Sequence, residues 1–401
     1  MLIKTTFVGD LMCKLPQLQV SQREFGYDFS PVFNKVAKLF QQSDYVVGNL
    51  ETPVAGSELG YTKTPSNFNS PVEFAMAAKE AGFDLFSIAN NHCLDRGVQG
   101  LFNTIDNLRA INVDYTGAYK SSEESREPFV KNFDGLKIAF LAFTYGTNSE
   151  WLNNCLDDEH KDCVDLFRKQ DAYIVPKPVS FKSIIIPIKN VAKKYLPQSI
   201  REKIKPIVIE DCVRVPEVQQ CDVYYDKKVQ DKIRVAKENS DVVIMYMHSG
   251  GQFNSVVGDY TKSLAHRLVD YGCDIVIGSH PHCVLNYEFY KGKIIVYSLG
   301  NFCYTPDYGY HYDGVYSDYS VVLNMYFDKE EKILKKTTIN VTKTIVEEDG
   351  NSVVYPISTL LKIVSEKQKN RLIEDVSSVL HRFFGQEIEY NSELDEIEVP
   401  F

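Results

Sequence analysis

The stretch Lys4-Thr5-Thr6-Phe7-Val8-Gly9-Asp10 joins a run of strand-forming residues to a glycine and an aspartate. Its β-branched and aromatic side chains are typical of a core strand, and the two residues that follow predict a polar turn. The stretch has no basic n-region, apolar h-region or small-residue cleavage site, so we do not expect export by a standard signal peptide. It therefore predicts a buried strand that ends at Asp10.

Strand-like and helical patterns alternate from this first strand to about residue 143. Strands separated by helices imply crossover connections and a largely parallel sheet that is covered on both faces. The expected strands and helices follow one another as Thr5–Val8, Pro31–Phe40, Tyr45–Val47, Pro71–Ala81, Leu85–Ala89 and Val98–Ala110.

A second series of elements begins after about residue 222. We expect helices and strands to alternate over Val223–Glu238, Val242–Met247, Asp259–Tyr271 and Asp274–Gly278. Three later runs are β-rich with short connections and predict an antiparallel run that closes a second sheet. They are Lys293–Ser298, Ser320–Phe327 and Ile333–Val346. Ile357–Phe384 is predicted to be helical, and the acidic end Glu387–Phe401 to be poorly ordered.

The proline-rich stretch Trp151–Asp222 has weak periodicity and predicts an insertion or cap. Its basic segment at 177–205 includes one amphipathic pattern, which allows two interpretations. A basic amphipathic helix makes peripheral contact with an anionic membrane surface, whereas the more common alternative is a solvated lid helix packed on the main domain. The apolar stripe is Ile188, Val191, Ala192 and Tyr195, opposite Lys189, Lys193 and Lys194.

Composition narrows the class of protein. Hydrophobic residues make up 44% of the 401-residue chain and charged residues 24%, the balance of a globular protein with a large core. The formal net charge of -10 provides no general basic field, so nucleic acid is not an expected partner. No apolar run approaches the roughly 20 residues that span a bilayer. The nine cysteines form no CxxC pairs and predict free thiols in a reducing cytosol, so we expect a cytoplasmic protein, at most peripheral to the inner membrane face.

Polar clusters follow the expected core strands, and the carboxyl ends of such strands are where α/β proteins bind ligands. Imidazole, carboxylate and amide oxygen together form the mixed ligand set that borderline divalent metals prefer. The clusters therefore favour a metal site over the alternative, a structural network of satisfied polar side chains. They are Gly9-Asp10, Asn49-Leu50-Glu51, Asn90-Asn91-His92, Met247-His248-Ser249-Gly250-Gly251, Gly278-Ser279-His280-Pro281-His282 and Ser298-Leu299-Gly300-Asn301-Phe302.

As an ordered set, these motifs resemble the CapA, or poly-gamma-glutamate capsule synthesis, family of bacterial proteins, whose domain is similar to the calcineurin-like metallophosphoesterases. The resemblance runs from about residue 2 to 327, skipping the insertion. It implies a four-layer α/β/β/α sandwich over residues 1–330, with an inserted cap segment at about 150–222 and a β/helical extension with an acidic tail over 331–401. Its motifs are Gly9-Asp10-Leu11-Met12, Asn49-Leu50-Glu51-Thr52-Pro53, Ala89-Asn90-Asn91-His92 with Asp95 and Gly97, His248, Gly278-Ser279-His280-Pro281-His282 and Tyr297-Ser298-Leu299-Gly300-Asn301-Phe302.

The resemblance also implies a centre of two divalent metal ions (Mn, Fe or Zn) that activates a bridging water. By similarity the ligands are Asp10, Glu51, Asn91, His248, His280 and His282. Asp10, Asn91 and His92 are the implied catalytic residues, and His92 protonates the leaving oxygen or holds the substrate phosphate. Residues expected to orient these groups or to contact substrate are Asn49, Asn90, Asp95, Gln252 and Asn301, although each asparagine is equally suited to a plain turn.

Two motifs depart from the related patterns. Phosphoesterases carry a histidine two residues after the first aspartate and an aspartate-rich second motif, where this chain has Met12 and Asn49-Leu50-Glu51, so one metal site is expected to be weaker or absent. CapA proteins usually continue their fourth motif as histidine, tryptophan, glycine, any residue and glutamate. This chain has His248-Ser249-Gly250-Gly251-Gln252, which predicts an altered pocket wall.

Three functions fit these motifs. The first is a metal-dependent phosphatase or phosphodiesterase of capsule, poly-gamma-glutamate or related envelope-polymer synthesis, with an anionic phosphorylated or polymeric substrate and capsule synthase partners. The second is a non-hydrolytic accessory protein that binds an anionic polymer or a synthase through the metal pocket. The third is a cytosolic sugar- or nucleotide-phosphate phosphatase in which tyrosines stack on the substrate, although packing over the sheet edge is the more common role of such rings. The tyrosines are Tyr304, Tyr308, Tyr310, Tyr312, Tyr316 and Tyr319.

Overall fold

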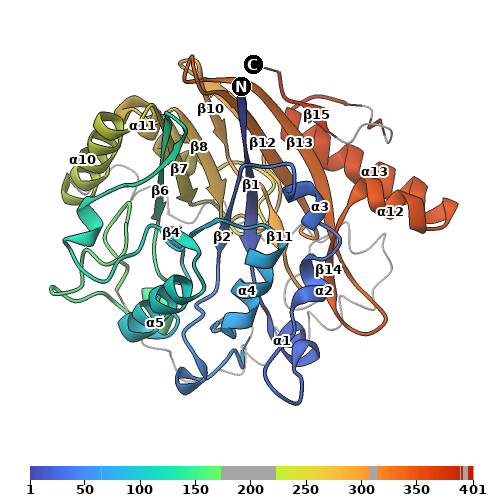
Figure 1. Ribbon diagram of the computed structural model, residues 1–401, viewed down its shortest axis with the longest axis horizontal. Coiled ribbons are helices and arrows are strands. Elements are labelled where there is room, and N and C mark those ends of the chain that lie inside the picture. The colour runs from blue at the N-terminus through green and yellow to red at the C-terminus, as the bar shows by residue number, and fades with distance from the viewer. Residues whose placement is uncertain (65, 173–222, 307–313, 389, 392–395, 401) are drawn as a thin grey trace, which may run out of the picture.

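Two β-sheets pack face to face, and helices cover their outer faces, in the computed structural model of the chain (Figure 1). The structure describes residues 1–64, 66–172, 223–306, 314–388, 390–391 and 396–400. The fold class is therefore the α/β sandwich that the sequence predicts.

The first sheet is built mainly from the beginning and the end of the chain. Its strands are β1 (Leu2–Leu11), β2 (Tyr45–Leu50), β3 (Leu85–Ser87), β4 (Asp114–Thr116), β11 (Asn301–Cys303), β12 (Tyr319–Asp328), β13 (Ile333–Val346), β14 (Ser352–Pro356) and β15 (Ile397–Glu398). They follow the order β14-β13-β12-β1-β2-β3-β4, with β11 beside β1 and β15 beside β13. Strands β1 to β4 are parallel, as predicted, whereas β12 runs antiparallel to β1.

The second sheet is formed by the middle of the chain. Its strands are β5 (Phe129–Phe133), β6 (Leu136–Thr144), β7 (Val242–His248), β8 (Ile275–Ser279), β9 (Tyr287–Tyr290) and β10 (Lys293–Val296), in the order β5-β6-β7-β8-β10-β9. Strands β6, β7, β8 and β10 are parallel to one another.

The predicted antiparallel closure of the second sheet is wrong for two of its three strands. Only β10 joins that sheet, whereas β12 and β13 extend the first one. The reason lies in β1, whose first half pairs with β12 over Leu2–Phe7 while its carboxyl end pairs with β11. Strand β13 pairs in turn with β12. The first sheet therefore continues across residue 330, where the sequence suggested a domain boundary.

Aromatic side chains fill the interface between the sheets. The ring of Phe7 on β1 lies 6.4 Å from that of Phe140 on β6 and 6.1 Å from that of Tyr246 on β7. The neighbours Met245 and Met247 point the opposite way, into the apolar cluster beneath the helices of the second sheet. This alternation places both faces of β7 in the core, as expected of a parallel strand.

The helices cover the two sheets separately. Helices α10 (Val223–Asn239) and α11 (Asp259–Tyr271) pack on the second sheet. Around the first sheet lie α1 (Leu15–Ser21), α2 (Ser30–Phe33), α3 (Ala37–Phe40), α4 (Val72–Ala81), α5 (Gly97–Ala110), α12 (Ile357–Ile363) and α13 (Glu366–Phe384). Short helices occur at α6 (Ser149–Leu152), η1 (Ser57–Leu59) and η2 (Glu124–Arg126). The helix expected over Pro31–Phe40 is split into α2 and α3, and the helical stretch Ile357–Phe384 is split into α12 and α13. The helices expected over Pro71–Ala81, Val98–Ala110, Val223–Glu238 and Asp259–Tyr271 are confirmed.

The end of the chain is better ordered than the sequence suggests. Strand β15 pairs with β13, and the Glu396 carboxylate accepts hydrogen bonds from Lys4 Nζ (2.8 Å) and Tyr326 OH (2.7 Å). Val399 is 1% exposed. The prediction of poor order is therefore wrong for residues 396–400. The backbone of this acidic segment pairs with β13, and its alternate residue Val399 is buried.

The predicted insertion divides into two parts. Residues 151–172 belong to the sandwich, since Val164 bridges to Ala118 and Leu166 bridges to Thr144, and both side chains are buried. Residues 173–222, which include the basic segment and the amphipathic pattern, lie outside the described residues. Cys212 and Cys221 lie there too. The other seven cysteines are free thiols, and all but Cys155 are buried.

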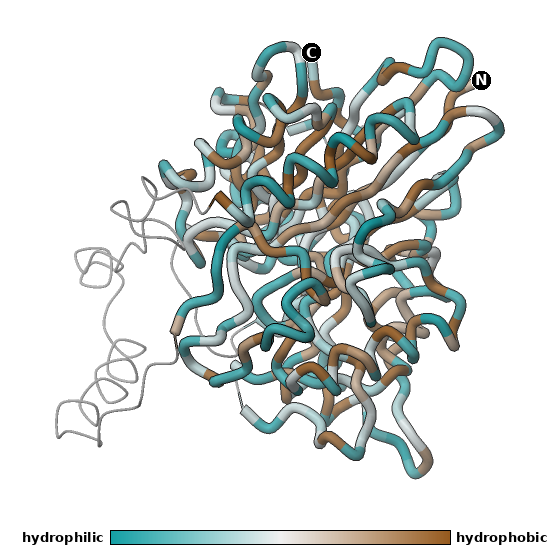
Figure 2. Tube along the Cα trace, turned by 90° about the vertical axis from the view of Figure 1, so that its left-hand side faces the viewer, coloured by the Kyte–Doolittle hydropathy of each residue, from teal (hydrophilic) through white to brown (hydrophobic). Residues whose placement is uncertain are grey.

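Hydrophobic and hydrophilic residues alternate along the helices, while the turns at the periphery are largely hydrophilic (Figure 2). None of the helices within the described part of the chain is both long enough and apolar enough to cross a membrane.

A candidate metal centre at the carboxyl ends of both sheets

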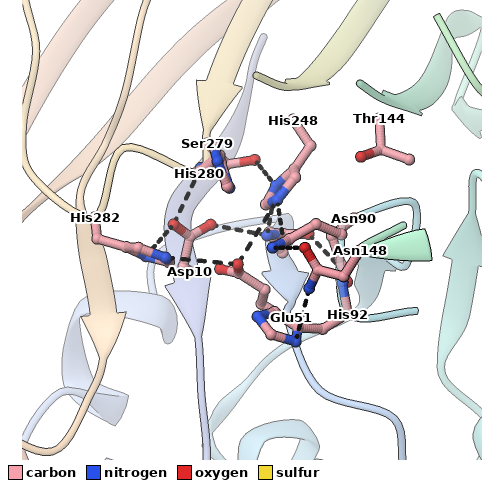
Figure 3. A network of polar contacts seen from close by, with 12 residues as sticks. Asp10, Glu51, Asn90, His92, Thr144, Asn148, His248, Ser279, His280 and His282 are labelled. Carbon is pink, nitrogen blue, oxygen red and sulfur yellow. Dashed lines mark hydrogen bonds and ion pairs between the residues drawn. The ribbon is translucent and has the colours of Figure 1, made fainter. Parts of the chain in front are cut away.

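The carboxyl ends of strands from both sheets meet in one buried cluster. The first sheet contributes Asp10 from β1 and Glu51 from the end of β2, and the second contributes His248 from β7 and His280 and His282 from the turn after β8. Figure 3 shows the histidines facing the two carboxylates. Each of these side chains is between 0% and 4% exposed. The structure thus brings together residues more than 270 positions apart, because parallel strands end at a common edge.

Five of the predicted ligands form two overlapping groups. Ligand atoms of Glu51, His248 and His280 lie within 4.8 Å of one another, and so do those of Asp10, Glu51 and His282. Glu51 belongs to both groups, as a carboxylate that bridges two ions would. The sixth predicted ligand, Asn91, joins the first group, because its Oδ1 lies 2.9 Å from His248 Nε2.

Three buried polar atoms of the cluster receive no hydrogen bond from the described residues. They are both carboxylate oxygens of Glu51 and the Nδ1 atom of His280. Burial, followed by the nearby Asp10 carboxylate, raises the pKa of Glu51 well above its ordinary value. Unsatisfied buried groups are costly, and a bound ion is one way in which a protein satisfies them. The donor set, two carboxylates with three imidazoles and one amide, fits a divalent cation of the zinc or manganese type.

Two histidines of the second sheet, His248 and His280, are held in their neutral form. Burial, together with the neighbouring imidazoles, lowers the pKa of His248 and of His280 well below the ordinary value. His248 lies with Nδ1 2.8 Å from Ser279 Oγ, which orients its ring toward Glu51. A neutral imidazole is the form that binds metal, so the low pKa keeps both rings ready as ligands.

Asn301 fixes the tautomer of His282. Its amide nitrogen donates to the backbone carbonyls of His282 (3.1 Å) and Ser317 (3.0 Å), so its Oδ1 must face the other way. That oxygen lies 2.9 Å from His282 Nδ1 and accepts its proton. The lone pair of His282 therefore resides on Nε2, the atom 3.7 Å from Glu51 Oε1. Such a partner orients a ligand histidine and raises its basicity.

Two predicted asparagines connect the carboxylate of the first strand to the loop after β3. Asn49 Nδ2 donates to Asp10 Oδ1 (2.8 Å), and Asn49 Oδ1 accepts from Asn90 Nδ2 (3.3 Å). Asn90 Oδ1 in turn accepts from the backbone amide of His92 (3.1 Å). These bonds place His92 on the same side of the cluster as Asn91.

His92 is paired with a buried carboxylate. Its Nδ1 lies 2.8 Å from Asp95 Oδ2, and that oxygen also accepts from the Phe68 amide. The ring of Phe68 packs 4.4 Å from the imidazole. An Nδ1–H bonded to Asp95 leaves Nε2 as the atom that can exchange a proton, which suits a general acid or base.

The turn that carries the two ligand histidines is strained. His280 has φ 96° and His282 has φ 55°, both in a region that residues with a Cβ rarely adopt. Strain of this kind persists where the surroundings over-determine it, and it clusters at functional sites. Here the His280 amide donates to Asp10 Oδ2 (3.2 Å), and Gly250 makes room for the turn, because a Cβ there would lie 2.6 Å from Pro281 Cγ.

The two departures from the related patterns have different places in the structure. Met12, at the position of the missing histidine, packs in a small buried cluster with Phe68 and Tyr304. Gln252 is partly exposed, and its neighbour Phe253 packs on His282, with ring centroids 5.4 Å apart. Among the tyrosines of the third hypothesis, Tyr304 and Tyr319 are buried, whereas Tyr308, Tyr310 and Tyr312 lie outside the described residues.

Sequence reasoning missed three residues of the cluster. Ser279 supports His248, and Lys14 is buried near Glu51. Asn148 follows β6 with φ 54°, accepts from Asn91 Nδ2 (3.2 Å) and lies with Nδ2 3.5 Å from His92 Nδ1. Ser279 stands inside the quoted motif Gly278-Ser279-His280-Pro281-His282, and Lys14 lies two residues after Met12, so their positions were the available signal. Nothing in the sequence marks the loop that carries Asn148.

The fold and this buried cluster define an α/β sandwich with a candidate metal centre between its sheets. A family model described as "Bacterial capsule synthesis protein PGA_cap" matches residues 4–305. The chain belongs to this family, which confirms the CapA resemblance of its motifs.

Two curated relatives are both named CapA. The chain is 29% identical over 302 residues to the capsule biosynthesis protein CapA of Bacillus anthracis, covering 75% of this chain and 59% of that protein. It is 27% identical over 305 residues to the PGA biosynthesis protein CapA of Bacillus subtilis, covering 75% and 63%. The chain thus spans about three fifths of the length of these relatives. Among solved structures, one described as a novel phosphatase from Mycoplasma pneumoniae matches with 14% identity and a TM-score of 0.39, over 85% of this chain and 93% of that one.

Proposed function

We propose that the protein is a divalent-metal-dependent phosphoester hydrolase that acts in the synthesis of a capsule or related envelope polymer. The observation that carries this proposal is the shared, buried and unsatisfied Glu51 carboxylate, which lies between three imidazoles and Asp10. Capsule synthesis enters through the family and through the names of the two Bacillus relatives.

The residues divide the chemical work between them. Asp10, Glu51, Asn91, His248, His280 and His282 would hold one or two divalent ions, which when bound supply a nucleophilic water and neutralise phosphoryl charge. His92, with its Nδ1 proton held by Asp95, would give the proton of Nε2 to the leaving oxygen. Asn148 and Asn90 keep His92 and Asn91 in place.

The test combines metal content with turnover. Protein purified without chelator is analysed for bound transition metal and assayed with an aryl phosphomonoester and an aryl phosphodiester, as wild type and as His280→Ala. Near-stoichiometric metal, and turnover that His280→Ala abolishes, are the expected results. His381→Ala, on α13, serves as the matched control and is expected to keep both.

A second candidate is a non-hydrolytic accessory protein that binds an anionic polymer or a synthase partner through the same pocket. Met12 favours it, because an apolar side chain occupies the position of a phosphoesterase histidine. Folded protein that holds metal yet hydrolyses neither ester would replace the hydrolase by this function. A cytosolic location and contact with capsule synthase components belong to the proposal in either form.

A further inference from the structure

Helix α13 contacts a segment that adjoins the candidate metal centre, although the helix lies beyond the residues that the family model matches. The helix begins with a capping box formed by Ser365 and Gln368, and it ends at Gly385, whose φ of 68° suits a helix C-cap. Near its end the ring of Phe383 lies 5.2 Å from that of Tyr287 on β9, so the helix also packs on the second sheet. It is therefore a fixed support for the side chains that it carries.

Two charged side chains of α13 hold the segment that leads into β12. Arg382 donates from Nη1 to the backbone carbonyl of Val315 (2.8 Å) and from Nη2 to that of Gly314 (2.7 Å). Nearer the start of the helix, the Asp375 carboxylate accepts a hydrogen bond from Tyr319 OH (2.7 Å). Because a guanidinium is a rigid planar fork, Arg382 fixes the direction of two successive carbonyls at once.

The segment between these contacts contains a strained residue. Tyr316 has φ 57°, a region that residues with a Cβ rarely adopt. The guanidinium of Arg382 lies 5.8 Å from the ring centroid of Tyr316, so it faces this residue as well as the two carbonyls before it. Strain of this kind persists where surrounding groups over-determine the backbone. The shape of the turn therefore depends on the contacts that α13 makes.

The same turn supplies a carbonyl that orients a candidate metal ligand. Asn301 Nδ2 donates to the carbonyl of Ser317 (3.0 Å), and Asn301 Oδ1 lies 2.9 Å from His282 Nδ1. The Ser317 carbonyl is one of the two acceptors that determine which way the Asn301 amide faces. His282 belongs to a ligand group with Asp10 and Glu51. A continuous series of contacts thus runs from α13 to the centre.

We propose that Arg382 is a positioning residue for the candidate metal centre. Through the turn before β12 it holds Asn301, and through Asn301 it sets the orientation of the His282 imidazole. The proposal rests on the metal centre of the proposed function, and it applies equally to a hydrolase and to an accessory protein. Helix α13 then contributes to the centre, although it lies outside the family match.

The ring nitrogens of His282 test this proposal without metal or turnover. Chelator-treated protein with isotope-labelled histidine is studied by two-dimensional NMR, and the His282 signals are those absent from His282→Gln. Arg382→Ala and Asn301→Ala are expected to shift the ring nitrogen signals of His282 in the same direction. Lys367→Ala, which removes an exposed charge from the same helix, should leave them in place. Unchanged His282 signals in Arg382→Ala would overturn the proposal.

A double-mutant cycle on metal affinity separates positioning from a general loss of stability. Arg382→Ala is expected to lower the metal affinity about tenfold, the lower end for a residue that supports a ligand, and to cost less than about twofold when Asn301 is already alanine. Arg382→Lys keeps the charge without the fork and should be intermediate. A loss that adds in full to that of Asn301→Ala would contradict the proposal. Wild type that binds no metal would count against the proposed function, and the His282 signals would still decide the role of Arg382.

Discussion

Two clusters of buried charge in this protein differ in how completely they are satisfied. Lys232 on α10 donates to Tyr119 OH (2.7 Å) and to Asp165, and Tyr119 OH also donates to Asp165 Oδ2 (2.9 Å). All three side chains are at least nine-tenths buried. In the candidate metal centre, by contrast, both oxygens of Glu51 and His280 Nδ1 receive no hydrogen bond from the described residues. The first cluster is satisfied by protein groups, whereas the second leaves buried groups that a bound ligand would satisfy.

Replacing Glu51 by Gln is expected to have the largest effect, because it removes the carboxylate common to both ligand groups. Metal affinity should fall by more than about 100-fold, the upper range for loss of a residue that only supports a ligand. The measurement is a metal titration, with the exposed Glu58→Gln as control. Unchanged metal affinity would mean that Glu51 does not bind the metal, and the proposed contrast between the two clusters would then fail.

Breaking the satisfied cluster should affect stability and leave metal binding intact. Lys232→Met leaves the Asp165 carboxylate buried without its cation, and we expect a loss of about 3–5 kcal/mol in the free energy of unfolding by urea. Lys227→Met, which removes an exposed ion pair on the same helix, should cost less than about 0.5 kcal/mol. A loss of metal from Lys232→Met would contradict the separation of the two clusters.

Removing a group that orients a ligand should have an intermediate effect on metal binding. Asn301→Ala frees His282 to adopt either tautomer, so metal affinity is expected to fall by about 10–100-fold with the fold preserved. Asn286→Ala, at a partly exposed asparagine near the same turn, is the control. The measurement is a calorimetric metal titration. Equal metal affinities of wild type and Asn301→Ala would mean that Asn301 only holds the backbone of the turn in place.

The smallest expected effect is a pH dependence of the metal-free protein. Burial raises the pKa of Glu51 above its ordinary 4.5, so folding favours the protonated carboxyl. That contribution to stability is complete below pH 4.5 and is lost as the pH rises through the pKa in the folded protein. Urea unfolding with chelator should therefore show Glu51→Gln gaining stability relative to wild type as the pH rises. A difference that does not change with pH would contradict the raised pKa.

The candidate site was more predictable from the sequence than the sheet pairing. Parallel strands carry their polar ends to one edge, so Asp10, Glu51 and His248 could be grouped without knowing which sheet holds each strand. The partner of β12 could not be deduced, because its run of strand-forming residues suits either sheet. Lys14 was missed for a related reason. Its cation–π partner Tyr304 lies far along the chain, directly after β11.

The position of β1 has a consequence for synthesis of the chain. This strand lies inside the first sheet between β2 and β12, yet β12 begins only at Tyr319. Ribosomes add about 5–20 residues per second, so one hydrogen-bonding edge of β1 waits for roughly 15–60 s before its partner emerges. An uncovered strand edge is a template for pairing with other chains. The fold thus leaves one edge of its first strand open to such pairing until the far end of the sheet is made.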